Sequence, residues 1–159
     1  MASDVFKTRL GWVGVEGGTK GVRRILLPAR SRASVSRELG GISEPGRLKS
    51  VRHKLLRYYG GRRVDFSGVK IDLSGYTGFQ RRVWSEAAKI PYGSRVTYAQ
   101  LARRIREPKA ARAVGNALNR NPFPPLIPCH RVVASNGLGG FAGGRVLKAK
   151  MLELERGGL

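Results

Sequence analysis

The sequence has few of the residues from which disulfides, metal sites and membrane spans are built. Among its 159 residues there are one cysteine, Cys129, and two histidines, His53 and His130. An internal disulfide is therefore excluded, and a structural zinc site lacks ligands. The chain has no apolar run long enough for a transmembrane helix and no signal-peptide pattern. We expect a protein of the reducing cytoplasm that holds no metal.

Acidic residues are also scarce, and this imbalance points to a polyanionic partner. The chain has 31 Lys and Arg against 10 Asp and Glu, a formal net charge of +21. The excess is spread evenly, because residues 1–75 carry 16 bases and 6 acids, and residues 76–159 carry 15 and 4. Nucleic acid and an anionic membrane surface both fit this charge. The remaining alternative is a basic soluble protein without such a partner.

The first half predicts a small mixed α/β region without a chemical site. Apolar stretches at Leu10–Val15 and Val22–Leu27, separated by a turn, predict a β-hairpin. Apolar residues at helical spacing predict a helix over residues 48–58. Val69–Leu73 alternates between apolar and polar side chains, which predicts a strand. Residues 31–46, in between, are polar and contain glycine.

The second half predicts four helices. Thr77-x-x-Gln80 and Thr97-x-x-Gln100 have the spacing of capping boxes, and each opens an amphipathic pattern. A third helix is predicted over Lys109–Asn119, with Pro108 at its N-terminus. The last helix is predicted over Arg145–Arg156.

The second and third of these helices have the pattern of a helix-turn-helix. They are short and joined by a tight turn, and the third carries Arg112, Asn116 and Asn119 on its polar face. A helix-turn-helix places such a face against DNA. A helical hairpin that binds nothing is the alternative, and the charge of +21 favours DNA binding.

Cys129 lies in a setting that suggests a reactive thiol. Four prolines between Pro122 and Pro128 forbid a helix, and apolar pairs flank Cys129-His130-Arg131. A buried extended segment would place the thiol in the interior. The neighbouring His130 and Arg131 would lower the pKa of the thiol and supply thiolate.

Two other interpretations of Cys129 stay open at this point. A lone cysteine is usually a small apolar core residue. A cysteine hydrolase would draw its base from elsewhere in the chain, and only His53 remains for that role. Because His53 falls on the charged side of the helix over residues 48–58, we expect it at the surface. The hydrolase interpretation is therefore the weaker one.

The motif around Cys129 resembles the active-site signature of the O6-alkylguanine-DNA alkyltransferases, also called methylated-DNA–protein-cysteine methyltransferases. The resemblance covers about Tyr76 to Glu155, and the first half matches only loosely. The motifs that stand in the family's order and spacing are Phe79-Gln80-x-x-Val83-Trp84, Ile90-Pro91-x-Gly93, Tyr98-x-x-Leu101-Ala102, Ala110-Ala111-Arg112-Ala113-Val114-Gly115, Asn121-Pro122, Pro128-Cys129-His130-Arg131-Val132-Val133 and Gly143-Gly144.

The resemblance implies an α/β fold of two small domains. Residues 1–75 would form a ribonuclease-H-like α/β support domain. Residues 76–159 would form a mostly helical domain with the helix-turn-helix and the alkyl acceptor. The implied activity is a single, irreversible transfer of the alkyl group of O6-alkylguanine in duplex DNA to the protein's own cysteine. No cofactor or metal is implied, and a monomer that acts on DNA and not on membranes is expected.

The resemblance also implies roles for catalytic residues. Cys129 would be the acceptor thiolate, and His130 would activate it through a water molecule. Glu155 would complete this relay, and Asn121 would hold the network in place. Tyr98 would donate its hydroxyl proton towards guanine N3.

Residues that contact DNA and the base are implied in the same way. Arg112 would fill the stack that the flipped nucleotide leaves, on a helix bound in the minor groove. The carbonyls of Cys129 and Val132 would accept from the guanine amino group, and the amides near Ala142 would face O6. The other residues expected at the DNA are Lys109, Ala110, Ala111, Asn116 and Arg131.

Two positions depart from the family's usual pattern. Phe141 stands where tyrosine is common, and Ala142 stands where serine is common. If a hydroxyl matters at either position, the range of alkyl groups that the protein accepts would differ from that of the family. O4-alkylthymine is a second candidate substrate. The cysteine itself is present, which separates the chain from alkyltransferase-like proteins that only bind lesions. A DNA-binding module with a structural Cys129 remains the rival from another class.

Overall fold

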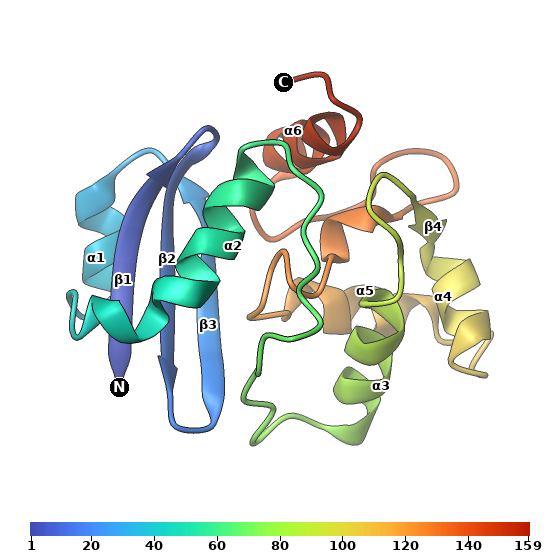
Figure 1. Cartoon of the computed structure of the whole chain (residues 1–159). Coiled ribbons are helices and arrows are strands. Elements are labelled where there is room, and N and C mark those ends of the chain that lie inside the picture. The colour runs from blue at the N-terminus through green and yellow to red at the C-terminus, as the bar shows by residue number, and fades with distance from the viewer. The chain divides into compact units, whose positions relative to one another are not determined.

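The computed structural model describes all residues, Met1–Leu159, and divides into two compact units. Unit 1 is Met1–Leu73 and unit 2 is Ser74–Leu159 (Figure 1). Gly75, where the sequence analysis placed the division, lies in the turn that opens unit 2. The architecture is mixed α/β as predicted, while the ribonuclease-H-like description of the first half stays a prediction.

Unit 1 is built on a three-stranded antiparallel sheet in the order β1-β2-β3. The strands are β1 (Ala2–Thr8), β2 (Gly11–Gly18) and β3 (Gly21–Ala29). The predicted hairpin is confirmed as β2 and β3. The sequence analysis did not find β1, which pairs with β2 along its whole length.

Two helices cover opposite faces of this sheet. α1 (Arg32–Leu39) lies against the face of Gly14, because a Cβ there would meet the side chain of Val35. α2 (Lys49–Tyr59) follows the 3-10 turn η1 (Pro45–Leu48) and confirms the predicted helix. Arg52 of α2 contacts Asp4 and Phe6, which point to the other face since Val5 pairs with Gly14.

The predicted strand at Val69–Leu73 is wrong. Only Ile71 makes a bridge, to Val22 of β3, through the carbonyl of Lys70 and the amide of Asp72. A turn at residues 67–68 precedes this bridge, and the chain leaves β3 again at Leu73. An alternation of apolar and polar residues shows that one face of a segment is buried, but it does not determine how many of its residues pair with a neighbouring strand.

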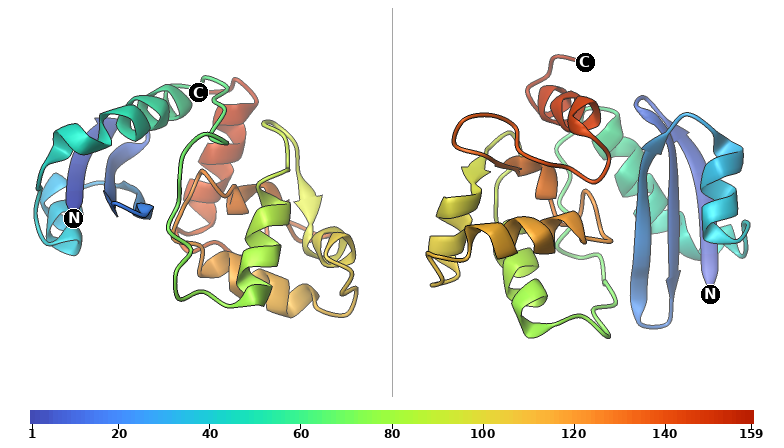
Figure 2. Two further views of the ribbon diagram at one scale, coloured as in Figure 1. Left: turned by 60° about the horizontal axis from the view of Figure 1, so that its bottom comes forward. Right: turned by 180° about the vertical axis from the view of Figure 1, so that it is seen from behind.

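Unit 2 contains the four helices predicted from the sequence. They are α3 (Gly78–Ala87), α4 (Tyr98–Arg104), α5 (Ala111–Asn119) and α6 (Arg145–Glu155). Both capping boxes are formed, each threonine accepting from the amide of its glutamine and each glutamine accepting from the amide of its threonine. α4 packs against α5, and α6 packs against the turn that holds the cysteine (Figure 2).

The start of α5 differs from the prediction. Its N-cap is Ala110, so Lys109 and Pro108 lie in the connection from α4 and not in the first turn. The amide of Ala110 bonds to the carbonyl of Glu107, which closes a turn before the helix begins. Proline suits a helix start but also suits such a turn, and the sequence does not distinguish the two.

Aromatic residues form the centre of unit 2. The ring of Trp84 on α3 packs edge-on against Tyr76 and Phe123. Its Nε1 donates to the carbonyl of Ala117 on α5 at 2.8 Å. The proline-rich segment that follows α5 is buried beside these rings from Phe123 onwards. It therefore enters the core of unit 2 as an irregular but stiff chain, with the cysteine at its end.

Candidate active site

Cys129 lies in a 3-10 turn, η2 (Cys129–Arg131), and not in the extended segment that the sequence predicts. Its amide bonds to the carbonyl of Ile127, two residues before it. The turn leads directly into β5 (Val132–Val133), which pairs in parallel with β4 (Val96–Thr97). Because Tyr98 follows β4, this pairing brings the N-terminus of α4 beside the cysteine turn.

The thiol of Cys129 is buried, with the residue 9% exposed. Burial raises the pKa of the thiol, and it outweighs a hydrogen bond from the Asn121 side chain and the charge of Lys148, which act in the opposite direction. The expectation of a lowered thiol pKa is therefore wrong. The group rests as a thiol at neutral pH, so a base must take its proton when it reacts.

Glu155 is the centre of a buried hydrogen-bond cluster next to the thiol. Its carboxylate accepts from His130 Nε2 at 2.5 Å, from Arg131 Nε at 2.8 Å and Nη2 at 3.0 Å, and from the amide of Gly93 at 3.0 Å. Burial alone would raise the pKa of Glu155, but His130 and Arg131 outweigh it and lower that pKa from 4.5 to about 2. Glu155 is therefore ionised at neutral pH.

This ionised carboxylate fixes the protonation of His130. A carboxylate only accepts hydrogen bonds, so the proton of the imidazole is on Nε2. Burial lowers the pKa of His130 more than the hydrogen bond and charge of Glu155 raise it, so the ring is neutral. Its Nδ1 then carries a lone pair and is the basic atom of the ring.

Tyr98 faces the same site from the start of α4. Its hydroxyl donates to the carbonyl of Gly140 at 3.3 Å. Burial and the negative charge that Cys129 carries as thiolate both raise the pKa of Tyr98. The phenol thus keeps its proton and is available as a donor. Gly139 makes room for the ring, since a Cβ there would lie 2.7 Å from the Tyr98 hydroxyl, and its φ is +74°.

Lys148 is a site residue that the sequence analysis missed. The whole residue is 0% exposed, and its ammonium donates to the carbonyls of Val132 at 2.6 Å and Gly140 at 3.0 Å. It also lies 3.4 Å from the Tyr98 hydroxyl. Burial lowers the pKa of Lys148 to about 8, while the thiolate charge of Cys129 acts to raise it. The missed signal is its spacing, because Lys148 lies seven residues before Glu155 on the inward face of α6.

Asn121 holds the segment that approaches the cysteine. Its Nδ2 donates to the carbonyl of Ile127 at 2.8 Å, and its Oδ1 accepts from the amide of Phe123 at 2.8 Å. The same side chain acts to lower the pKa of the Cys129 thiol, against the effect of burial. The structure thus brings Asn121, Tyr98, His130 and Glu155 together around Cys129.

The residues expected at the DNA divide into two groups. On α5 and just before it, Lys109, Arg112 and Asn116 are exposed, while Ala110 and Ala111 are half-buried. These five lie on or beside the outer side of α5.

Arg131 does not fit a DNA contact and corrects that expectation. The residue is 8% exposed, and its guanidinium is held by Glu155 and by the carbonyl of Ile90 at 2.7 Å, with the ring of Tyr92 beside it. Arg131 follows the catalytic candidates Cys129 and His130 in the sequence, but its guanidinium is paired with the buried Glu155 and is not available to DNA. A buried arginine of this kind positions the carboxylate that it pairs with.

Two of the three residues expected in the substrate pocket, Val132 and Phe141, contact Lys148. The carbonyl of Val132, expected to accept from guanine, already accepts from Lys148. A carbonyl has two lone pairs, so one remains for a second donor. Phe141 is half-buried with its ring 6.0 Å from the Lys148 ammonium, and Ala142 is exposed.

No three His, Cys, Asp or Glu side chains gather where they could hold a metal ion. No helix has both the length and the apolar character needed to cross a membrane.

Comparisons with known proteins agree on one family. The family model described as "6-O-methylguanine DNA methyltransferase, DNA binding domain" matches residues 78–157. The methylated-DNA–protein-cysteine methyltransferase of Methanothermobacter thermautotrophicus is 38% identical over 90% of this chain and 78% of its own length. That of Methanosarcina mazei is 35% identical over 100% of this chain and 99% of its own.

A solved structure agrees over nearly the whole chain. The Mycobacterium tuberculosis protein OGT in complex with DNA has a TM-score of 0.81 and 33% identity, covering 98% of this chain and 92% of its own. The Methanosarcina mazei relative is 35% identical over the full length of this chain, so the agreement is not restricted to unit 2. The chain belongs to the methylated-DNA–protein-cysteine methyltransferases, a family of enzymes.

Proposed function

We propose that this protein repairs DNA by transferring the alkyl group of O6-alkylguanine in duplex DNA to the sulfur of Cys129, once per molecule. The observation that carries the proposal is the buried thiol of Cys129 next to the His130–Glu155 pair, with the Tyr98 hydroxyl facing the same site. Family membership supports DNA repair by alkyl transfer, and the residue roles below are our inference.

The first step makes the nucleophile. The thiol rests protonated because it is buried. His130 Nδ1 is the basic atom, and a bridging water molecule carries the thiol proton to it. Glu155 stabilises the resulting imidazolium through the hydrogen bond at Nε2. The pair therefore acts as a general base whose orientation is fixed by the second member.

The second step is a displacement at an sp3 carbon. The thiolate attacks the alkyl carbon, the S–C bond forms, and the C–O6 bond breaks with its electron pair on guanine. The Tyr98 proton passes to guanine N3 and neutralises that charge. The Lys148 ammonium, 3.4 Å from the Tyr98 oxygen, stabilises the phenolate left behind. No tetrahedral intermediate forms, so no oxyanion hole is required.

The product explains why each molecule acts once. A thioether is a poor substrate for hydrolysis, and the site offers no second cysteine that could accept the group. The protein is thus consumed stoichiometrically. The same chemistry applies to O4-alkylthymine, which is a second candidate substrate.

DNA binding is assigned to α5, with the base turned out of the helix. A buried thiol reaches O6 only if the nucleotide leaves the stack. The exposed Arg112 on α5 would fill the gap, while Lys109, Ala110, Ala111 and Asn116 would face the backbone from the minor groove. The remaining pocket contacts are the carbonyls of Cys129 and Val132 and the loop at Phe141 and Ala142.

Intact-mass measurement tests the transfer directly. The protein is incubated with a duplex that contains one O6-methylguanine, and we expect a gain of one methyl group that does not increase with further duplex. Cys129→Ser should gain nothing, and an unmodified duplex should give no change with either protein. If DNA is bound but no mass is gained, Cys129 is structural and the rival, a DNA-binding module, is the better account.

A further inference from the structure

Unit 1 carries a strong positive charge that the proposed chemistry does not use. Its 16 bases face 6 acids. Four of those acids are paired with arginines, in Asp4–Arg52, Glu16–Arg24, Glu38–Arg24 and Glu44–Arg47. The segment from Pro45 to Val64, which contains α2, has no acid at all. The excess charge is therefore concentrated around this helix.

The exposed face of α2 is a cationic stripe. Lys49, Arg52, His53, Leu56 and Arg57 are exposed and follow one another at the spacing of a single helix face. Arg52 is paired with Asp4, which leaves Lys49 and Arg57 as the cations of the stripe that can meet a partner. At 1.5 Å per residue, the stripe from Lys49 to Arg57 is about 12 Å long.

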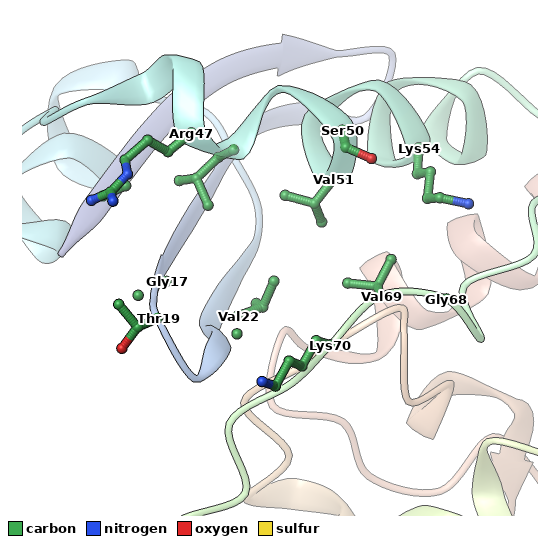
Figure 3. Close-up of a pocket in the computed structure, with 14 residues that line it drawn as sticks. Gly17, Thr19, Val22, Arg47, Ser50, Val51, Lys54, Gly68, Val69 and Lys70 are labelled. Carbon is green, nitrogen blue, oxygen red and sulfur yellow. The ribbon is translucent and has the colours of Figure 1, made fainter.

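A cavity of about 320 Å³ continues this basic region on the other side of α2. In Figure 3, Val22, Val51 and Val69 point into its middle, while Arg47, Lys54 and Lys70 stand at its rim. No acidic residue lines it. The three cationic groups lie at separate places on the rim and do not converge on one point, which disfavours a single small anion. An extended chain of negative charges can contact all of them.

We propose that this region binds the phosphate backbone of duplex DNA as a second contact, separate from α5. We call it the α2 surface and define it as Lys49, His53 and Arg57 on the helix with Lys54 and Lys70 at the cavity rim. Binding to DNA phosphates needs clustered cations without acids and no particular base sequence. The choice of DNA as the polyanion rests on the proposed function.

The structure argues against an anionic membrane as the partner. A helix that lies in a membrane surface presents a broad apolar face to the lipid. The apolar residues Val51, Leu55 and Tyr58 of α2 are buried in the core of unit 1, and only Leu56 is exposed on the stripe. The helix therefore has charge to offer a polyanion but no free apolar face to insert.

The salt dependence of DNA binding tests the proposal on the full chain. The affinity for an undamaged duplex is measured at several salt concentrations for the wild type and for Lys49→Gln combined with Arg57→Gln. Each phosphate contact contributes about 0.9 to the slope of log affinity against log salt. Loss of two contacts should make the slope less steep by about 2.

The matched control is Lys7→Gln combined with Arg23→Gln. Both side chains are exposed in unit 1, on β1 and β3, and the net charge falls by the same amount. This control should keep the wild-type slope. Circular dichroism at the assay temperature verifies that each variant is folded. The charge-reversed pair Lys49→Glu and Arg57→Glu should weaken binding further than the glutamine pair.

Three outcomes overturn the proposal. The first is an equal slope for the wild type and the α2 variant, and the second is an equal change in the α2 variant and its control. The third is a loss of binding to phosphatidylglycerol vesicles by the α2 variant while its binding to DNA is unchanged. Methyl transfer by the wild type is followed in the same preparation, so a failure of the repair function is seen separately.

Discussion

Replacing Glu155 with glutamine should destabilise unit 2 by an amount that the structure allows to be worked out. Its side chain is 0% exposed and accepts hydrogen bonds from His130, Arg131 and Gly93. The fall of its pKa from 4.5 to about 2 corresponds to about 3 kcal/mol of stability at neutral pH. Removing one partner of a buried ion pair costs roughly 3–5 kcal/mol, which agrees.

The free energy of unfolding of the wild type should lose this contribution of Glu155 at low pH. Because the pKa of Glu155 is lower in the folded state, its contribution is complete above about 4.5 and is lost as the pH falls towards 2. Glu155→Gln has no such group, so the gap between the two proteins should close over this window. Other carboxylates titrate in both proteins and cancel in the difference.

Urea unfolding followed by tryptophan fluorescence measures this gap. The chain has two tryptophans, and Trp84 alone reports unit 2 when Trp12 in unit 1 is replaced by phenylalanine. Glu153→Gln, an exposed change on the same helix, is the control and should cost less than about 0.5 kcal/mol. A Glu155→Gln protein as stable as this control at pH 7, or a gap that stays constant down to pH 2, would refute the reasoning.

Three further changes test the site by single-turnover methyl transfer. Lys148→Met should slow the transfer by about 100-fold, equal to about 2.7 kcal/mol. The wild-type rate should fall above about pH 8 as Lys148 loses its charge, and a rate that does not change with pH in this range would contradict the role of Lys148. Gly139→Ala should displace the Tyr98 ring and slow the transfer, whereas Gly115→Ala, whose Cβ would lie 3.7 Å from that ring, should not. Arg112→Ala should slow repair of duplex DNA by at least about 10-fold, since the side chain is proposed to fill the gap that the flipped nucleotide leaves in the base stack. Transfer from the free O6-alkylguanine base should be unchanged. Equal losses on both substrates would show that Arg112 acts in the chemical step instead.

Elements with a strong local signal were the ones that the sequence predicted well. The capping boxes at Thr77 and Thr97 depend on residues three apart, so they specify α3 and α4 without knowledge of the rest of the fold. α1 has no comparable signal, since Val35 is its only buried residue and its start is capped by Ser31 alone. Ala2–Thr8 alternates poorly, because its polar residues Ser3 and Asp4 are buried as well.

The site residues that belong to a family motif could be predicted from the sequence. Those whose role depends on being buried could not. The resemblance names Cys129, His130 and Glu155, and the structure places them together, while their catalytic roles stay predictions. Arg131 and Lys148 look like surface cations in the sequence, yet both are buried. The spacing of Lys148 places it on the buried face of α6, but whether a charged side chain is buried also depends on acceptors from distant parts of the chain, such as the carbonyl of Val132.

The charges around Cys129 explain how a thiol with a raised pKa can still be a nucleophile. Arg131 and Lys148 are cationic, Glu155 is anionic and His130 is neutral, so the buried cluster carries one net positive charge while the thiol is protonated. Transfer of the thiol proton to His130 leaves that sum unchanged, because the charges of the thiolate and the imidazolium cancel. Burial sets the resting state, since it penalises an ion in an apolar interior. The uncompensated cation is fixed in place before the reaction, so it stabilises the thiolate without any reorganisation when the proton leaves. α6 supplies both the cation Lys148 and the anion Glu155 from one face, two helical turns apart. This single element therefore contributes both the charge that acts on the thiolate and the carboxylate that orients its base.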